Sequence, residues 1–176
     1  MTKNIQRKIC LKNRFSLDIE TRKQYSQIIC NKLFDLNLKG NIMSYYPVND
    51  EVDISYFNFN KFVSYPVIMF DNEMEIYLPI NNDFTLNYYK IPEPNTHTAI
   101  KVEKNFISTV IVPLVGFDEK CNRLGHGKGY YDRFLENLKV RKIGVAFECQ
   151  KLDKIITDKY DIPLDMIISE KNIYTK

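Results

Sequence analysis

The sequence predicts an α/β domain in which helices cover both faces of a mostly parallel sheet, giving a three-layer sandwich. Segments with helical periodicity alternate with short, continuous apolar runs, which are typical of parallel strands buried on both faces. The chain has 176 residues, of which 44% are apolar, so it is long enough to bury a substantial core. We therefore expect residues 1–176 to form a single domain with a Rossmann-like sheet.

Two helices are expected near the N-terminus. Apolar residues one turn apart predict a short helix over residues 3–14. Its basic residues recur at helical spacing and predict a basic stripe: Lys3, Arg7 and Arg14. The next helix is expected to be capped by Ser16, to continue to Leu36 and to stop at Gly40.

The remaining elements follow from apolar runs and from turn residues. Strands are predicted at residues 42–46, 65–70, 74–78, 85–89, 108–112, 142–147 and 166–168. A weak helix is predicted over 51–60 and a firmer one over 130–138. Residues 91–94 contain two prolines and should be rigid and extended, whereas 113–128 reads as a long loop.

Composition and charge exclude several classes of protein. A net charge of +3 from 25 basic and 22 acidic residues gives little support to a nucleic-acid binder, which usually has a strongly basic surface. The four cysteines form no C-x-x-C pair, so neither a disulfide framework nor a zinc site is expected. The first residues lack the apolar core of a signal peptide, and no apolar run approaches the roughly 20 residues of a membrane span. We expect a cytoplasmic protein without nucleic-acid or membrane partners.

One segment, residues 122–133, contains most of the residues that suggest a binding site. Half of the chain's six glycines stand there at alternate positions: Gly125, Gly127 and Gly129. Glycine lets successive backbone amides turn toward an anion, and Arg123 and Lys128 add two cations to the same loop. This arrangement suits a polyphosphate, and Asp132 could hold its magnesium ion. The alternative is a flexible turn with solvated charges, and the spacing matches neither the Walker nor the dinucleotide pattern.

The order of several motifs resembles that of the 5-formyltetrahydrofolate cyclo-ligase family. The segments that carry the resemblance are 3–7, 46–53, 91–94, 112–118, 123–135 and 161–165. The run R-L-G-x-G-x-G-Y-Y-D, from Arg123 to Asp132, is the most specific of them. One departure is Cys121, which stands where the family usually has glycine.

The resemblance implies a monomeric enzyme that converts 5-formyltetrahydrofolate to 5,10-methenyltetrahydrofolate with ATP and Mg²⁺. ATP would phosphorylate the formyl oxygen, the neighbouring folate nitrogen would attack the formyl carbon, and phosphate would then leave. Such a reaction depends mainly on positioning and on stabilisation of charge.

The resemblance also implies roles for individual residues. Arg123 and Lys128 would be catalytic, neutralising the phosphates, and Asp132 and Asp161 would bind the metal. The residues expected to bind ATP are Lys3, Asn4, Ile5, Gln6, Arg7, Arg123, Leu124, Gly125, His126, Gly127, Lys128, Gly129, Tyr130 and Tyr131. Those expected to bind the folate are Tyr46, Glu51, His126, Gly127, Lys128, Gly129 and Tyr130.

Two other functions stay open at this point. The chain could be a nucleotide- or anion-binding module that has kept the fold and lost turnover. It could also be an unrelated enzyme of sugar phosphates or CoA with a similar α/β layout, although the 123–133 run argues against this.

Overall fold

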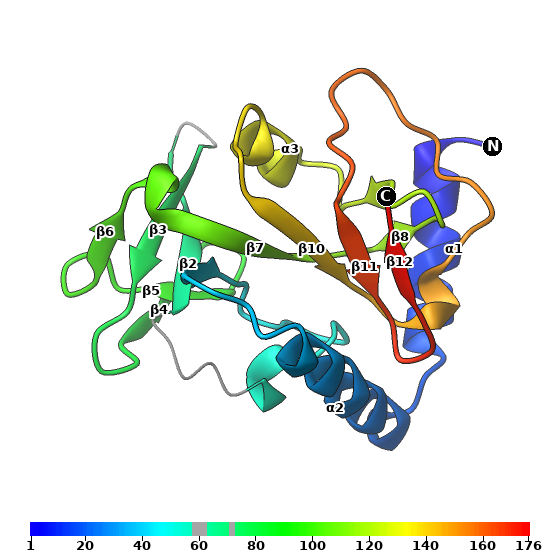
Figure 1. Cartoon of the computed structure of the whole chain (residues 1–176), viewed down its shortest axis with the longest axis horizontal. Coiled ribbons are helices and arrows are strands. Elements are labelled where there is room, and N and C mark those ends of the chain that lie inside the picture. Colours follow the sequence, from blue (N-terminus) through cyan, green and yellow to red (C-terminus); the bar gives the residue numbers. More distant parts are fainter. Residues whose placement is uncertain (58–62, 71–72) are drawn as a thin grey trace.

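The computed structural model describes residues 1–57, 63–70 and 73–176. Its principal strands are β1 (Asn41–Met43), β2 (Val63–Ile68), β3 (Met74–Leu78), β6 (Ile100–Val102), β7 (Ile107–Pro113), β10 (Arg141–Val145), β11 (Met166–Ile168) and β12 (Ile173–Thr175). Within the described residues they form one eight-stranded sheet in the order β12-β11-β10-β7-β1-β2-β3-β6, shown in Figure 1. The five strands from β11 to β2 are mutually parallel, whereas β12, β3 and β6 run antiparallel to their neighbours. The predicted α/β class is confirmed.

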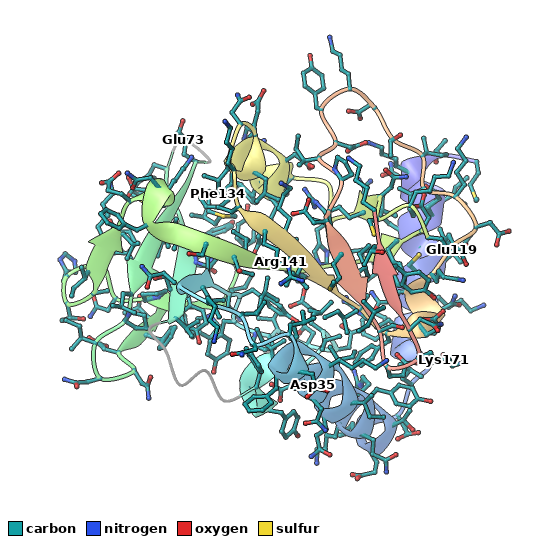
Figure 2. The ribbon with its side chains drawn as sticks, viewed as in Figure 1. Asp35, Glu73, Glu119, Phe134, Arg141 and Lys171 are labelled. Carbon is teal, nitrogen blue, oxygen red and sulfur yellow. The ribbon has the colours of Figure 1, made fainter. Side chains whose placement is uncertain are left out.

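Helices cover both faces of this sheet. The helix α2 (Ile19–Asp35) buries Ile29 and Leu33 against strand residues such as Ile111 on one face. On the other face α3 (Tyr130–Leu135) buries Phe134, which Figure 2 shows between the helix and the strands. The first helix, α1 (Lys3–Phe15), lies at one end of the sheet beside the short strand β8 (Gly116–Phe117). Among the described helices, none has the length and apolar character needed to cross a bilayer.

The ends of the first two helices differ from the prediction. Asp18, not Ser16, caps α2, because its Oδ1 accepts a hydrogen bond of 2.8 Å from the backbone of Thr21. Ser16 instead ends α1. The second helix stops at Asp35 and the chain turns at Asn37, whose φ is +46°, so Gly40 is not the stop residue.

The predicted basic stripe on α1 is also only partly correct. Arg14 is 3% exposed and forms a buried ion pair with Asp50, so only Lys3 and Arg7 of the three remain near the surface. Periodicity placed all three cations near one face. It could not show that the far end of that face is covered by the loop after β1.

Several other predicted elements change in length. Strands β3 and β11 have the predicted bounds, whereas the expected strand at 42–46 ends at Met43. The expected strand at 85–89 is β4 (Phe84–Leu86), which pairs with β5 (Pro92–Pro94). Of the helix expected over 51–60, only a 3₁₀ turn at Ile54–Tyr56 is present, and residues 58–60 lie outside the described residues. The helix expected over 130–138 ends at Leu135.

The region predicted as a long loop, 113–128, contains a β-hairpin. Its strands are β8 and β9 (Arg123–Leu124), joined by a turn in which Cys121 takes a φ of +59°. The Asp118 carboxylate holds this turn by accepting hydrogen bonds from the backbone of Lys120, Asn122 and Ile155. The hairpin therefore starts the glycine-rich segment from a fixed base. The sequence prediction also missed the edge strands β6 and β12.

Candidate active site

The candidate site lies where the chain leaves the carboxyl ends of two adjacent parallel strands. The segment after β1 carries Tyr46 and Glu51, and the segment after β7 leads through the hairpin to the glycine-rich loop. Ligand sites in open α/β sheets form at this edge of the sheet. The N-terminal half of α1 and residues 154–162 close the same region from the side.

The glycine-rich loop packs directly against Arg7 of α1. The Arg7 Nε donates a 2.8 Å hydrogen bond to the Gly125 carbonyl, and its Nη1 donates one of 2.6 Å to Asn4. Gly127 has a φ of +96°, and a side-chain carbon there would stand 3.1 Å from the Arg7 guanidinium carbon. Gly129 is also left-handed, with a φ of +72°. Glycine is thus required where the loop turns and where it approaches Arg7.

The two cations within the loop segment have different surroundings. Arg123 has a side chain that is only 4% exposed, and its Nη2 donates a 2.5 Å hydrogen bond to Asp132. Its Nε has no hydrogen-bond partner within the part of the chain that the structure describes, and its guanidinium carbon lies 5.9 Å from the centroid of the Tyr131 ring. Lys128, in contrast, is exposed on the loop. Arg123 supports the loop from within, whereas Lys128 is available to an incoming ligand.

Lys3 connects α1 to the segment that carries Asp161. Its Nζ donates hydrogen bonds of 2.7 Å to Asp158 and 2.5 Å to Asp161. Partial burial lowers the pKa of Lys3, but these hydrogen bonds outweigh it and hold the pKa above its usual value. Gln6, one turn along, is completely buried and binds the backbone of Lys154 and Ile156 through its side-chain amide.

The two candidate metal ligands lie on neighbouring segments. Asp132 Oδ1 accepts hydrogen bonds from Arg123 and from the backbone of Ile162, the residue after Asp161. Each carboxylate is thus paired with a cation, Asp132 with Arg123 and Asp161 with Lys3. No cluster of three metal-binding side chains occurs among residues 1–57, 63–70 and 73–176. Magnesium needs only one or two carboxylates when phosphate oxygens complete its shell, so two predicted ligands on neighbouring segments do not require such a cluster.

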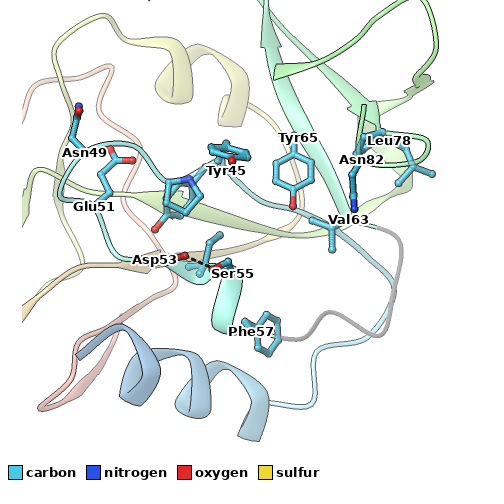
Figure 3. Close-up of a pocket in the computed structure, with 14 residues that line it drawn as sticks. Tyr45, Asn49, Glu51, Asp53, Ser55, Phe57, Val63, Tyr65, Leu78 and Asn82 are labelled. Atoms are coloured by element: carbon cyan, nitrogen blue, oxygen red, sulfur yellow. Dashed lines mark hydrogen bonds between the residues drawn. The ribbon is translucent and has the colours of Figure 1, made fainter. Parts of the chain in front are cut away.

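A cavity of about 1050 Å³ opens beside the loop after β1, and both predicted folate residues from that loop, Tyr46 and Glu51, line it. Figure 3 shows Glu51 at one end of the cavity and Leu78 and Asn82 at the other, with Tyr65 between them. The ring of Phe84 packs against Tyr46 and Tyr65, with centroids 5.6 and 5.4 Å away. The cavity therefore combines flat aromatic walls with two carboxylates, Glu51 and Asp53.

Glu51 joins this cavity to the glycine-rich loop. Its side chain is 8% exposed, and its Oε1 lies 3.5 Å from Nε2 of His126. Its Oε2 accepts a 3.2 Å hydrogen bond from the backbone of Val48 in its own turn. Glu51 of the cavity and His126 of the glycine-rich loop are thus in direct contact.

The tyrosines around Glu51 stay uncharged at neutral pH. Burial raises the pKa of Tyr45 and Tyr131 well above the usual value, and the nearby Glu51 carboxylate raises both further. For Tyr130, burial and then a hydrogen bond with Tyr89 raise the pKa. These neutral hydroxyls add no negative charge beside Glu51 or the glycine-rich loop.

The other predicted ATP-binding residues divide between the loop and its supports. Ile5 is 47% exposed, whereas Leu124 is buried in β9. Sequence reasoning missed Tyr65, Phe84 and Asp158. The two aromatics come from distant strands, and Asp158 had no motif around it. Only their positions in the folded chain bring them to the site.

Comparisons with known proteins identify a matching family and several similar sequences. The family model described as the 5-formyltetrahydrofolate cyclo-ligase family matches residues 2–170. The 5-formyltetrahydrofolate cyclo-ligase of Mycoplasma pneumoniae is 34% identical over 183 aligned residues, which cover 97% of this chain and 100% of that protein. The Escherichia coli K12 protein of the same name is 32% identical, and the alignment covers 56% of this chain and 65% of that protein.

Two solved structures are similar over nearly the whole chain. The NMR structure of Aquifex aeolicus 5,10-methenyltetrahydrofolate synthetase has a TM-score of 0.87 at 30% identity, covering 99% of this chain and 93% of that one. The 5,10-methenyltetrahydrofolate synthetase from Mycoplasma pneumoniae has a TM-score of 0.79 at 31% identity, covering 97% and 99%. With a family match from residue 2 to residue 170, this chain belongs to the 5-formyltetrahydrofolate cyclo-ligase family of enzymes.

Proposed function

We propose that this protein converts 5-formyltetrahydrofolate to 5,10-methenyltetrahydrofolate in a reaction that consumes ATP and requires Mg²⁺. The observation that supports this best is the contact between Glu51 and His126. It joins an aromatic-walled cavity, suited to a flat ring system, to a glycine-rich loop suited to a polyphosphate. A reaction between a folate and a nucleotide requires the two sites to meet in this way.

The chemistry proceeds in two steps that balance. The formyl oxygen attacks the γ-phosphorus of ATP, so that a new oxygen–phosphorus bond forms and ADP leaves. The neighbouring folate nitrogen then attacks the formyl carbon, forms the new carbon–nitrogen bond and loses its proton. The carbon–oxygen bond breaks and inorganic phosphate departs. Phosphorylation turns a poor leaving oxygen into a good one, and the protein mainly positions the reactants and stabilises charge.

The cations around the loop stabilise the phosphates. Lys128 is exposed on the loop and can approach the transferred phosphoryl group directly, while Arg7 closes over Gly127 from α1. Arg123 holds the loop from behind through Asp132 and contributes its positive charge at short range. Asp132 and Asp161 would hold Mg²⁺, which would neutralise charge on the phosphate oxygens.

Glu51 anchors the folate. The pterin ring offers adjacent N–H donors, and a carboxylate that is largely shielded from water is a strong acceptor for such a pair. The neutral hydroxyls of Tyr45 and Tyr131 beside it add no negative charge that would compete with Glu51. This geometry sets the orientation of the ring relative to the loop that holds ATP.

A single spectrophotometric assay tests the proposal. Methenyltetrahydrofolate absorbs in the near ultraviolet, where 5-formyltetrahydrofolate does not. With purified protein, ATP and Mg²⁺, we expect this band to grow, and we expect no growth when ATP, Mg²⁺ or protein is omitted. A protein that binds ATP in calorimetry but never generates the band would be a binding module, and the enzymatic proposal would be rejected.

A further inference from the structure

Arg14 and Asp50 form a buried ion pair that none of the roles above uses. Arg14 Nε lies 2.8 Å from Asp50 Oδ2, and Nη2 lies 2.9 Å from Oδ1, so the contact is bidentate. The two side chains are 4% and 2% exposed. The remaining guanidinium nitrogen, Nη1, donates a 3.3 Å hydrogen bond to the Leu114 carbonyl just after β7. Because desolvation offsets much of the attraction, such a pair is weak evidence for a role in stability alone.

The pair fixes one side of the turn that carries Glu51. Asp50 directly precedes Glu51, and Asn49 before it takes a φ of +55°. On the other side of Glu51, the Val52 carbonyl accepts a 2.6 Å hydrogen bond from the Tyr45 hydroxyl. The Asp53 amide donates one of 3.0 Å to Ser26 of α2. The turn is therefore held after Glu51 by Tyr45, which follows β1, and by Ser26 of α2, and before it by Arg14 of α1.

The same helix also supports the nucleotide side of the site. Arg14 lies seven residues after Arg7, whose guanidinium binds the Gly125 carbonyl and packs on Gly127. Two turns of α1 thus connect the glycine-rich loop to the turn of Glu51. A rigid helix between the two sites keeps their separation constant.

We propose that Arg14 is a positioning residue that, through Asp50, aims the Glu51 carboxylate at the folate cavity and at His126. The proposal rests on the proposed role of Glu51 as folate anchor. Arg14 does not touch a substrate itself, since its guanidinium is fully engaged by Asp50 and Leu114.

Arg14→Lys is the sharpest variant to test this. Lysine keeps the positive charge beside Asp50 but loses the planar fork, so the aspartate keeps a partner while the turn loses its fixed orientation. We expect the KM for 5-formyltetrahydrofolate to rise about tenfold, equivalent to about 1.4 kcal/mol, with the KM for ATP unchanged. Glu119→Gln, which breaks an exposed ion pair with Lys151 at the outside of the molecule in Figure 2, is the matched control and should change neither constant.

A double-mutant cycle separates positioning from a general structural effect. If Arg14 acts through Glu51, adding Arg14→Lys to Glu51→Gln should leave the folate KM where Glu51→Gln alone puts it. If the two effects multiply, Arg14 does not act through Glu51 and the proposal is wrong.

A second measurement does not depend on turnover. The chain has two histidines, and only His126 lies 3.5 Å from Glu51, so imidazole NMR signals report on this contact with His97 as an internal reference. We expect Arg14→Lys to move the His126 signal toward its position in Glu51→Gln while the His97 signal stays. An unchanged His126 signal would overturn the proposal even in a fully active enzyme.

The two measurements also separate this proposal from the proposed function. A shifted His126 signal in a protein that never forms the methenyl product would support the positioning role and reject the cyclo-ligase reaction. Asp50→Asn, which retains the shape of the side chain, should shift the same signal and serves as the second variant if Arg14→Lys does not fold.

Discussion

At the scale of single residues, similar side chains take opposite roles because their burial differs. Arg123 and Lys128 are both cations of the glycine-rich segment, and nothing in the neighbouring sequence predicts that one is buried and the other exposed. In the folded chain Arg123 is 4% exposed and bound to Asp132, whereas Lys128 is exposed. Removing one partner of a buried pair leaves an uncompensated charge, while removing an exposed lysine leaves the fold intact. Substitutions at the two positions should therefore have different consequences.

Lys128→Ala should reduce activity with little effect on stability. Loss of one preorganised charge at the transferred phosphate lowers kcat about a hundredfold, and the midpoint of thermal unfolding should hardly change. Arg123→Ala, in contrast, should also lower the free energy of unfolding by about 3 kcal/mol. Initial rates and thermal melts of both variants test this, with Lys120→Ala as the control at another exposed lysine. Full activity in Lys128→Ala would remove this lysine from the mechanism.

Glu51→Gln should weaken folate binding and leave ATP binding nearly intact. The amide has the same shape but lacks the charge that strengthens hydrogen bonds to the pterin, a loss of about 1.5–3 kcal/mol of binding free energy. Calorimetric titration with each ligand separately measures the two affinities. An equal loss of both would mean that Glu51 supports the turn and the neighbouring loop and does not contact the folate.

At the scale of elements, α1 and the glycine-rich loop form one unit. Arg7 binds the Gly125 carbonyl, Lys3 binds Asp161, and Gln6 binds the backbone of residues 154 and 156. One helix face thus holds the loop on one side and the segment of Asp161 on the other. This unit explains why a basic helix far away in the sequence lies beside the glycine-rich loop.

Gly127→Ala tests the closeness of this contact. The added carbon would stand 3.1 Å from the Arg7 guanidinium carbon. The backbone φ of Gly127 is +96°, a value that residues with a side chain rarely adopt. We expect about 1 kcal/mol of destabilisation and a clear loss of ATP affinity, because Arg7 or the loop must move. Gly125 lies outside the left-handed region, but a side-chain carbon there would stand 3.1 Å from Nη1 of Arg123, so Gly125→Ala serves as the comparison for fold stability and should destabilise less. Unchanged ATP affinity in Gly127→Ala would show that the contact with Arg7 does not matter for binding.

The same elements show what the sequence could predict and what it could not. Alternating glycines are a local signal, so the loop and its cations were predictable from spacing. The partners of Arg123 and Arg14 were not, because Asp132 lies nine residues after Arg123, in the first turn of α3, and Asp50 lies 36 residues from Arg14. Similarly, the strands β8 and β9 are two residues each, too short for any periodicity to indicate. Local sequence patterns identified the candidate residues, whereas tertiary contacts determine which of their charged side chains are buried and which are exposed.

At the scale of the whole molecule, the site and the C-terminal edge of the sheet are held by different charge networks. The site contains paired cations and carboxylates around the glycine-rich loop. The edge is held by Glu148, which accepts hydrogen bonds from Ser169 at the end of β11 and from Tyr174 in β12. The small net charge of +3 thus conceals local clusters of opposite sign. Stability and activity should therefore respond to different substitutions.

Glu148→Gln should change the pH dependence of stability. Burial raises the pKa of Glu148, but hydrogen bonds from Ser169 and Tyr174 and the nearby lysines outweigh it and hold the pKa below its usual value. A carboxyl group with a lowered folded-state pKa stabilises the fold above its unfolded-state pKa and loses that contribution as the pH falls through the folded-state value. At pH 7 the variant should be about 1 kcal/mol less stable than the wild type. The difference should shrink in acid, as both side chains become neutral.

Urea unfolding at a series of pH values measures this directly, with Glu103→Gln as the control at an exposed carboxylate that follows β6, at the opposite edge of the sheet. The control should follow the wild type at every pH, because a solvent-exposed charge contributes little to stability. Turnover at pH 7 should be unchanged in Glu148→Gln, since this network does not reach the glycine-rich loop in any described contact. A stability difference that stays constant from neutral to acidic pH would mean that the Glu148 charge does not hold β12 at the edge of the sheet. Packing of Tyr174 on Phe117, whose ring centroids are 5.4 Å apart, would then hold it instead.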